Sequence, residues 1–143
     1  MKLGYALLAD AAQVTPDGKL SMLGGDFDTI FVRSFPAQHS SLALVVKLDA
    51  ARDDCGREHE MRVTSSGPLN SSFLPAVESR FTPQLNPLFA NRPTRVLLVF
   101  NFQSLMFPNQ GKYQFHITVD GTQLGTVPLE LTRIPQPEIR ARD

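Results

Sequence analysis

FPNQGKYQFHITVDGTQLGTVPLEL, residues 107–131, is the stretch that decides the fold class of this chain. Its apolar side chains fall on every second position over residues 113–119, which is the period of a strand buried on one face. The Asp-Gly pair at residues 120–121 tolerates the positive φ angles that a tight hairpin turn needs. Alternation resumes at residues 127–131, where Pro128 cannot donate a ladder hydrogen bond and so predicts an edge position. The stretch therefore predicts a β-hairpin.

The N-terminal third shows the same pattern with one interruption. Residues 1–14 read as a first core strand, and TPDG at residues 15–18 is a turn signal that joins it to an apolar segment at residues 20–32. Gly24 and Gly25 break the alternation of that segment. Such a break is typical of a bulge, or of a bend at which a chain switches sheets.

Further strands are expected at residues 42–48, 57–64 and 94–105, with a short one at residues 73–79. Residues 96–100 (VLLVF) are apolar on both faces, as in a central strand that is covered on both sides. Either a loop or a second protomer must then cover the outer face of this strand.

Seven or eight strands without a helix-period stretch predict an all-β fold, a single antiparallel β-sandwich. The closing hairpin also resembles immunoglobulin-like and C2-like sandwiches, so the resemblance implies one of these architectures. A length of 143 residues with 42% hydrophobic content suits one compact domain. We assign residues 1–132 to this domain. Residues 133–143 contain two prolines and alternating charge, and we expect them to form a flexible C-terminal tail.

Charge and cysteine content restrict the partners and the compartment. Fourteen Lys and Arg residues against fourteen Asp and Glu residues leave no net charge, so the basic surface of a nucleic-acid-binding protein is not expected. The single Cys55 cannot form an internal disulfide and suits a reducing compartment. Asp10 interrupts the first apolar run, which is too short for a signal peptide or a membrane helix. We expect a cytoplasmic protein that binds neither nucleic acid nor membranes.

No motif in the sequence demands an enzymatic activity. The three histidines share no metal-ligand spacing, and the sequence has no nucleophile elbow and no phosphate-binding glycine loop. We expect no catalytic residue and no cofactor. Calcium is an alternative only if aspartates from several loops meet at one end of the sandwich, because it takes about six to eight oxygen ligands. The candidates are Asp26, Asp28, Asp53, Asp54 and Asp120.

The best candidates for a recognition surface lie in residues 65–93, which lose the alternation and hold five of the eleven prolines. Long ordered loops in compact domains are often functional. We therefore predict a partner-binding loop that contains Phe81, Leu85, Leu88 and Phe89. The alternative is that these side chains close one open end of the sandwich, since most large apolar side chains are buried.

A surplus of apolar residues indicates assembly. The first strand is apolar on both faces, with Leu3, Tyr5 and Leu7 expected on one and Ala6 and Leu8 on the other. A sandwich has one interior, so the second face predicts a covered surface, most simply in a homo-oligomer or against a protein partner. The predicted assembly face consists of Leu8, Leu97 and Val99.

Three pieces of the chain together resemble a family of small bacterial β-sandwich domains of unknown function. They are residues 9–31 (ADAAQVTPDGKLSMLGGDFDTIF), residues 42–48 (LALVVKL) with residues 56–63 (GREHEMRV), and the closing hairpin. The resemblance implies a fold but no activity, cofactor or catalytic residue.

The sequence thus favours a non-catalytic protein-interaction or assembly module. A sandwich that binds a small ligand, a carbohydrate or calcium is the alternative. It is weakened by the absence of Trp and by having only Tyr5 and Tyr113, both on expected core faces. An enzyme with an unrecognised site is a third possibility, which a pocket with titratable groups would indicate.

Overall fold

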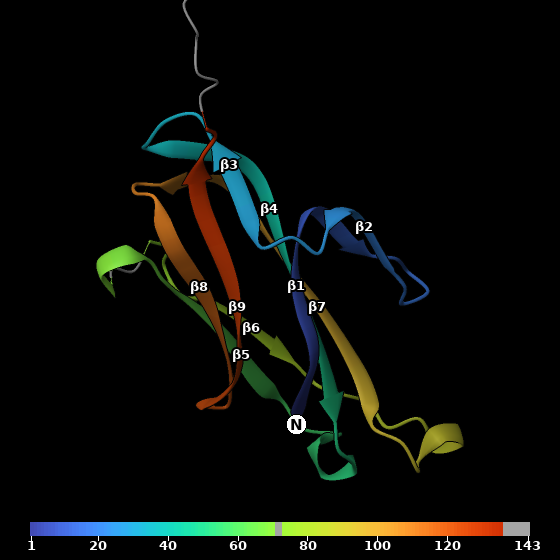
Figure 1. The fold of residues 1–143 in the computed structure, drawn as a ribbon. Helices are drawn as coiled ribbons and strands as arrows, with labels where there is room; N and C mark the ends of the chain where they lie inside the picture. Colours follow the sequence, from blue (N-terminus) through green and yellow to red (C-terminus); the bar gives the residue numbers. More distant parts are fainter. Residues whose placement is uncertain (71–72, 136–143) are drawn as a thin grey trace, which may run out of the picture.

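Two β-sheets enclose one apolar core in the computed structural model, which describes residues 1–70 and 73–135 (Figure 1). Sheet A joins four strands in the order β2-β1-β4-β7, and sheet B joins five in the order β3-β9-β8-β5-β6. The all-β prediction is confirmed. The elements are β1 (Lys2–Val14), β2 (Leu20–Gly25), β3 (Thr29–Val32), β4 (Ala37–Ala50), η1 (Arg52–Asp54), β5 (His59–Ser66), η2 (Pro68–Asn70), β6 (Val77–Phe81), η3 (Pro87–Phe89), β7 (Thr94–Phe107), β8 (Gly111–Val119) and β9 (Thr122–Arg133), where η marks a single 3-10 turn.

The core residues follow the alternation of the sequence, because successive side chains of a strand point to opposite faces. The inward positions of one central strand in each sheet are all buried: Leu42, Leu44, Val46 and Leu48 on β4, and Tyr113, Phe115, Ile117 and Val119 on β8. The hydroxyl of Tyr113 donates to the carbonyl of Asn109 at 2.6 Å and accepts from its N–H at 3.2 Å, so the buried phenol is satisfied.

Glycine turns guide the chain as the sequence predicts. Asp120 and Gly121, with φ of 49° and 82°, form the turn between β8 and β9. Gly24, with φ of 59°, lies where the chain leaves sheet A, since β2 pairs with β1 whereas β3 pairs with β9 in sheet B. The predicted change of sheet is confirmed.

The orientation of β3 differs from the antiparallel prediction. β3 runs parallel to β9, with Thr29 opposite Glu130 and Val32 opposite Arg133. No hairpin joins these strands, and the crossing from sheet A sets the direction in which β3 enters sheet B. Pro128 precedes the residues that pair with β3, so β9 is an edge at that point, as predicted.

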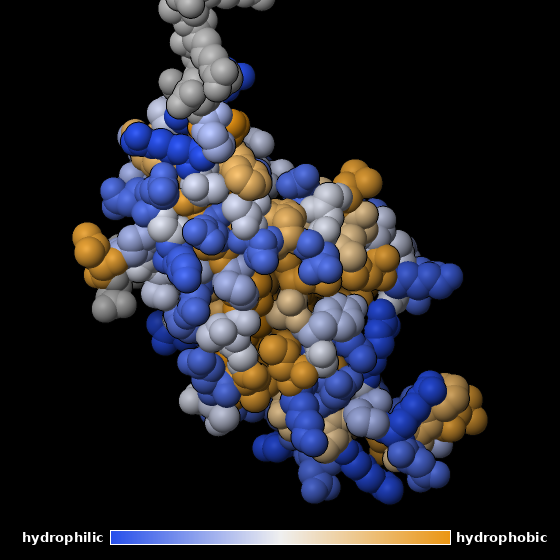
Figure 2. All heavy atoms as spheres, viewed as in Figure 1, coloured by the Kyte–Doolittle hydropathy of each residue, from blue (hydrophilic) through white to orange (hydrophobic). Residues whose placement is uncertain are grey.

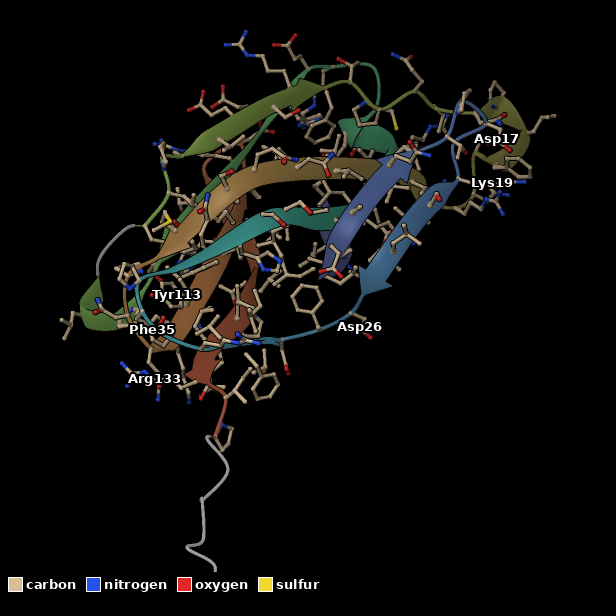
Figure 3. The ribbon with its side chains drawn as sticks, turned by 90° about the horizontal axis from the view of Figure 1, so that it is seen from above. Asp17, Lys19, Asp26, Phe35, Tyr113 and Arg133 are labelled. Carbon is tan, nitrogen blue, oxygen red and sulfur yellow. The ribbon has the colours of Figure 1, made fainter. Side chains whose placement is uncertain are left out.

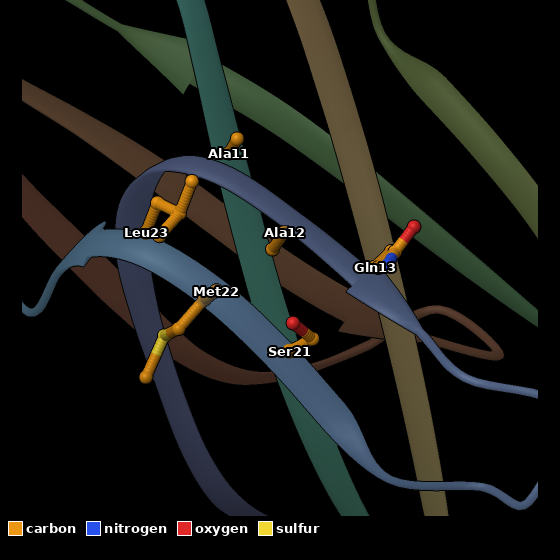
Figure 4. A pocket seen from close by; sticks show the side chains of 6 residues that line it. All are labelled: Ala11, Ala12, Gln13, Ser21, Met22 and Leu23. Carbon is orange, nitrogen blue, oxygen red and sulfur yellow. The ribbon is translucent and has the colours of Figure 1, made fainter.

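The hairpin formed by β1 and β2 folds over the outer face of sheet A. β1 pairs with β4 as far as Ala9, and Ser41 Oγ then donates to the carbonyl of Asp10 at 3.0 Å. At the far end of the hairpin, Arg95 Nη1 of β7 donates to the carbonyl of Gly18 at 2.9 Å. The hairpin therefore crosses β4 and β7, as Figure 4 shows from close by.

This hairpin is the cover that the sequence led us to expect. Val45 lies opposite Leu7 and Val99 and outside the core cluster, yet it is 0% exposed. Leu97 and Val99 share this outer face and are half-buried. A segment of the same chain thus covers much of the outer apolar face.

The structure separates the three residues of the predicted assembly face. A register shift in β1 between Leu3 and Tyr5 turns Leu3 and Leu8 toward the core, where Leu8 is 0% exposed. Leu8 is therefore a core residue, unlike Leu97 and Val99. The same shift leaves Tyr5, which we expected in the core, 38% exposed beside Lys47 on the outer face.

Strand number and strand position also depart from the sequence analysis. Nine strands occur among the described residues rather than seven or eight, because the segment at residues 20–32 divides at its glycines into β2 and β3. β7, predicted to be central, is the last strand of sheet A. Ile134 N–H still donates to the carbonyl of Val32 at 2.8 Å, so the chain is held beyond residue 133, and the rest of the expected tail, from residue 136 on, lies outside the described residues.

None of the helical turns in residues 1–70 and 73–135 is long and apolar enough to cross a membrane.

Candidate functional site

The connection between β6 and β7 presents exposed apolar side chains on a capped turn. Asn86 precedes η3, and its Oδ1 accepts a hydrogen bond from the N–H of Leu88 at 3.0 Å. Its carbonyl accepts from the N–H of Phe89 at 2.9 Å. This turn displays Leu88 and Phe89, which are 84% and 46% exposed. At the lower right of Figure 2, where the chain of η3 projects, apolar surface lies beside strongly hydrophilic surface.

Arg92 fixes the orientation of the exposed ring. Its guanidinium carbon lies 3.9 Å from the centroid of the Phe89 ring, within the range of a cation–π contact. The N–H of Arg92 also donates to the carbonyl of Phe89 at 3.2 Å. Leu88, Phe89 and Arg92 form one ordered projection, which we call the loop knob.

A groove of about 500 Å³ lies between the loop knob and the outer face of sheet A. Its charged side chains are Lys47, Asp49, Arg92 and Arg95. Lys47 Nζ lies 3.2 Å from Asp49 Oδ1 and forms an ion pair with it. The groove thus contains one negatively charged and three positively charged side chains. The groove is therefore electropositive next to an aromatic ring.

The turn of the β1–β2 hairpin lies at the same end of the molecule as the loop knob. Arg95, which lines the groove, donates to the carbonyl of Gly18 in this turn at 2.9 Å. Figure 3 shows Asp17 and Lys19 of the turn at the end opposite Phe35 and Arg133. A second, shallow hollow of about 150 Å³ lies on the hairpin itself and is lined by uncharged residues (Figure 4). Charged groups that could orient a ligand are thus found in the groove and not in this hollow.

The predicted partner-binding loop divides into two parts. Phe81 ends β6 opposite His59, and its ring stacks on the imidazole with centroids 5.6 Å apart. It packs against the core, and Leu85 is half-buried. Phe81 therefore fits the alternative in which the side chain closes the end of the sandwich, whereas Leu88 and Phe89 project into solvent.

His59 forms a separate polar cluster with two of the aspartates considered for calcium. The side chain is 2% exposed, with Nδ1 2.6 Å from Asp120 Oδ2 and Nε2 2.7 Å from the carbonyl of Asp54. Both partners are acceptors, so both ring nitrogens donate and the imidazole carries a positive charge. Asp120 Oδ1 accepts from the N–H of Glu60 at 2.9 Å, which ties the β8–β9 turn to β5.

The contacts of this cluster raise the pKa of His59 and lower that of Asp120. Burial is the largest influence on His59 and lowers its pKa, but the hydrogen bonds to Asp120 and to the Asp54 carbonyl, together with the charge of Asp120, outweigh it. The pKa of His59 is therefore raised above its ordinary value of 6.5. The hydrogen bond from Glu60 N–H, and then that from His59, lower the pKa of Asp120.

The five aspartates do not converge on one site. Asp54 and Asp120 flank His59, whereas Asp26 and Asp28 line a different hollow beside Val127. Within the described ranges, no group of three metal-ligating side chains could hold an ion. The calcium hypothesis thus gains no support from the placement of these residues.

The model of a family of unknown function (DUF6941) matches residues 4–132 of the chain. The chain belongs to this family. No curated protein matches it. The match extends from β1 to the last residues of β9, so the DUF6941 domain comprises both sheets. The expected membership of a family of unknown function is confirmed, and the family brings no activity with it.

Sequence reasoning found the apolar half of the candidate site in this DUF6941 domain and missed the basic half. Arg92 and Arg95 flank the end of the loop in the short run NRPTR, residues 91–95, and Lys47 comes from a distant strand. Two arginines beside a predicted binding loop were a usable signal. The contribution of Lys47 depends on the pairing of β4 with β7, which no local pattern reveals.

The pair of His59 and Asp120 is expected to make the stability of the DUF6941 domain depend on pH. Because the folded pKa of His59 is raised, its contribution is full below about pH 6.5 and is lost as the pH rises through the folded value. Because the folded pKa of Asp120 is lowered, its contribution is present above about pH 3.9 and is lost as the pH falls through the folded value.

We therefore expect Asp120→Asn to lower the melting temperature more at about pH 5.5 than at about pH 9. Asn accepts the positive φ of the turn, so the variant removes the charge and keeps the backbone. Thermal unfolding at both pH values tests this, with the exposed Asp53→Asn as control. An equal effect at the two pH values would contradict a charged His59.

Proposed function

We propose that this domain is a non-catalytic protein-interaction module and that the loop knob is its recognition element. The observation that carries the proposal is the display of Leu88 and Phe89 in solvent on a hydrogen-bonded turn. Exposing these side chains has no benefit for folding, because apolar surface is stabilised by burial. A partner that buries these two side chains would gain the free energy of removing their apolar surface from water.

The composition of the loop knob supports a protein partner. Aromatic residues and arginine are enriched among the residues that dominate interface energies, and here they stack on each other at 3.9 Å. An ordered projection also loses little conformational entropy on binding. The expected partner presents an apolar pocket for Leu88 and Phe89, with acidic groups at its rim for Arg92 and Arg95.

A small anionic ligand in the groove is the second candidate. The volume of about 500 Å³ suits a small molecule, and Lys47, Arg92 and Arg95 supply positive charge beside the Phe89 ring. Thermal unfolding with a panel of organic anions and sugars would separate the two functions. A rise in the melting temperature that Arg95→Gln abolishes would favour the ligand.

With this function we also propose a bacterial origin, a cytoplasmic location and an immunoglobulin-like or C2-like arrangement of the two sheets. Support for the location comes from the single Cys55, a free thiol that suits a reducing compartment. The resemblance of three sequence segments to bacterial β-sandwich domains supports the origin and the arrangement.

Leu88→Asp is expected to weaken partner binding by about 30-fold or more, as for a residue that dominates an interface. The test is affinity capture of the tagged domain from a lysate of its native host, with mass spectrometry of the captured proteins. Leu69→Asp is a matched control, because Leu69 is 95% exposed on a different turn. Equal capture by wild type and Leu88→Asp, or equal loss in both variants, would contradict the proposal.

A further inference from the structure

Among the described strands that end a sheet, β7 is the longest. It spans 14 residues and is the last strand of sheet A, where β4 is its only partner. Among the described residues, no backbone hydrogen bond joins the other side of β7 to any segment. A long row of N–H and C=O groups is thus open to a further strand.

The sequence of β7 suits a strand with neighbours on both sides. Residues 96–107 (VLLVFNFQSLMF) contain no charged side chain. Val96, Leu98 and Phe102 face the core but are only partly buried. The pattern that predicted a central strand is therefore present at an edge, and a strand added there would make β7 central.

The other edges are shorter than β7 or contain a proline, as β9 does at Pro128 ahead of its pairing with β3. β7 itself has one irregular position, Ser104, with φ of 53°. β2 has six residues, β3 has four and β6 has five. β6 also carries Glu78 and Arg80, which form ion pairs with Arg62 and with Glu58 and Glu60 on the outer face of sheet B. Short length and charge are the usual means by which proteins block pairing at an edge.

We propose that β7 pairs antiparallel with β7 of a second copy of this chain, which joins two A sheets into one continuous sheet. A two-fold axis places each strand opposite its own sequence, so any charge near the axis would face its like. The twelve residues from Val96 to Phe107 contain no such charge. This absence favours a second copy over a charged partner peptide, which would find no countercharge along the strand.

Asn101 marks the middle of the open stretch. It is exposed on the outer face of sheet A, away from the hairpin turn, which is held at Arg95 near the start of β7. Its neighbours along this face, Val99 and Gln103, are also uncharged. A charge at Asn101 would thus lie close to its symmetry mate without disturbing the core.

Opposite charges introduced at Asn101 in separate variants test the pairing. We expect the wild-type chain of 15.8 kDa to show twice that mass by light scattering at about 100 μM. Asn101→Lys and Asn101→Glu, each alone, should raise the dimer dissociation constant by at least about tenfold. Mixing the two variants should restore the dimer, because opposite charges then meet. Gln114→Lys, on the exposed face of β8, should leave the dimer unchanged.

Three results would overturn the proposal: a wild-type monomer at about 100 μM, a dimer that persists in both Asn101 variants, or a mixture that stays monomeric. The loop knob is intact in all of these variants, so partner capture through Leu88 can be measured separately. Loss of capture in Leu88→Asp with a normal dimer would support the proposed function alone, and the reverse would support the β7 pairing alone.

Discussion

Replacing Phe115 by alanine is expected to lower the free energy of unfolding by about 3–5 kcal/mol. Phe115 is 0% exposed at the centre of the core. Its ring lies 6.0 Å from that of Phe102 and 5.9 Å from that of Phe73. Alanine would leave a cavity bounded by both sheets, which the surrounding strands cannot fill without breaking their pairing. Against a typical total stability of about 5–15 kcal/mol, this is a large fraction.

Urea denaturation monitored by circular dichroism measures this loss. Gln114→Ala is the matched control, since Gln114 is the exposed neighbour of Phe115 on β8, and its effect should stay within about 0.5 kcal/mol. A loss of less than about 1 kcal/mol in Phe115→Ala would mean that the two sheets do not share this core.

Replacing Val45 by aspartate is expected to lower the free energy of unfolding by at least about 3 kcal/mol. Val45 points away from the core between the sheets, yet it is 0% exposed under the β1–β2 hairpin. An unpaired carboxylate there would lose its hydration as long as the hairpin stays in place. The experiment therefore distinguishes a face covered by the chain itself from one that only a second copy could cover.

Gln114→Asp is the control for Val45→Asp, because it places the same charge at an exposed strand position outside the proposed β7 pairing. The control should unfold at nearly the wild-type urea concentration. If Val45→Asp also did so, the outer face would be open in solution. Limited proteolysis at the hairpin turn would then show whether the hairpin had moved.

Periodicity predicted the strands because alternation is a local property of the chain. The inward residues of β4 and β8 and the Asp120–Gly121 turn could all be assigned from neighbouring positions. The change of sheet at Gly24 was also readable, since glycine tolerates the positive φ found there.

What the sequence could not reveal depends on contacts between distant segments. The folded-back hairpin contacts sheet A through hydrogen bonds such as that between Arg95 and Gly18, and the groove is lined by both Lys47 and Phe89. The misplacement of Leu8 had a more local cause. One register shift in β1 reverses which residues face the core. A prediction that assumes a strict period of two along the whole strand places the residues beyond such a shift on the wrong face.

The parallel pairing of β3 with β9 bears on how the domain is made. Thr29 pairs with Glu130, about a hundred residues later, and β9 lies between β3 and β8 in the finished sheet. On the ribosome, all four strands of sheet A are available once residue 107 has emerged, but β3 has no neighbour until the chain reaches residue 133. Biosynthesis of this domain therefore ends with an insertion. β9 is translated after both of its neighbours and must enter between them, and until then the apolar inner face of sheet B is incomplete.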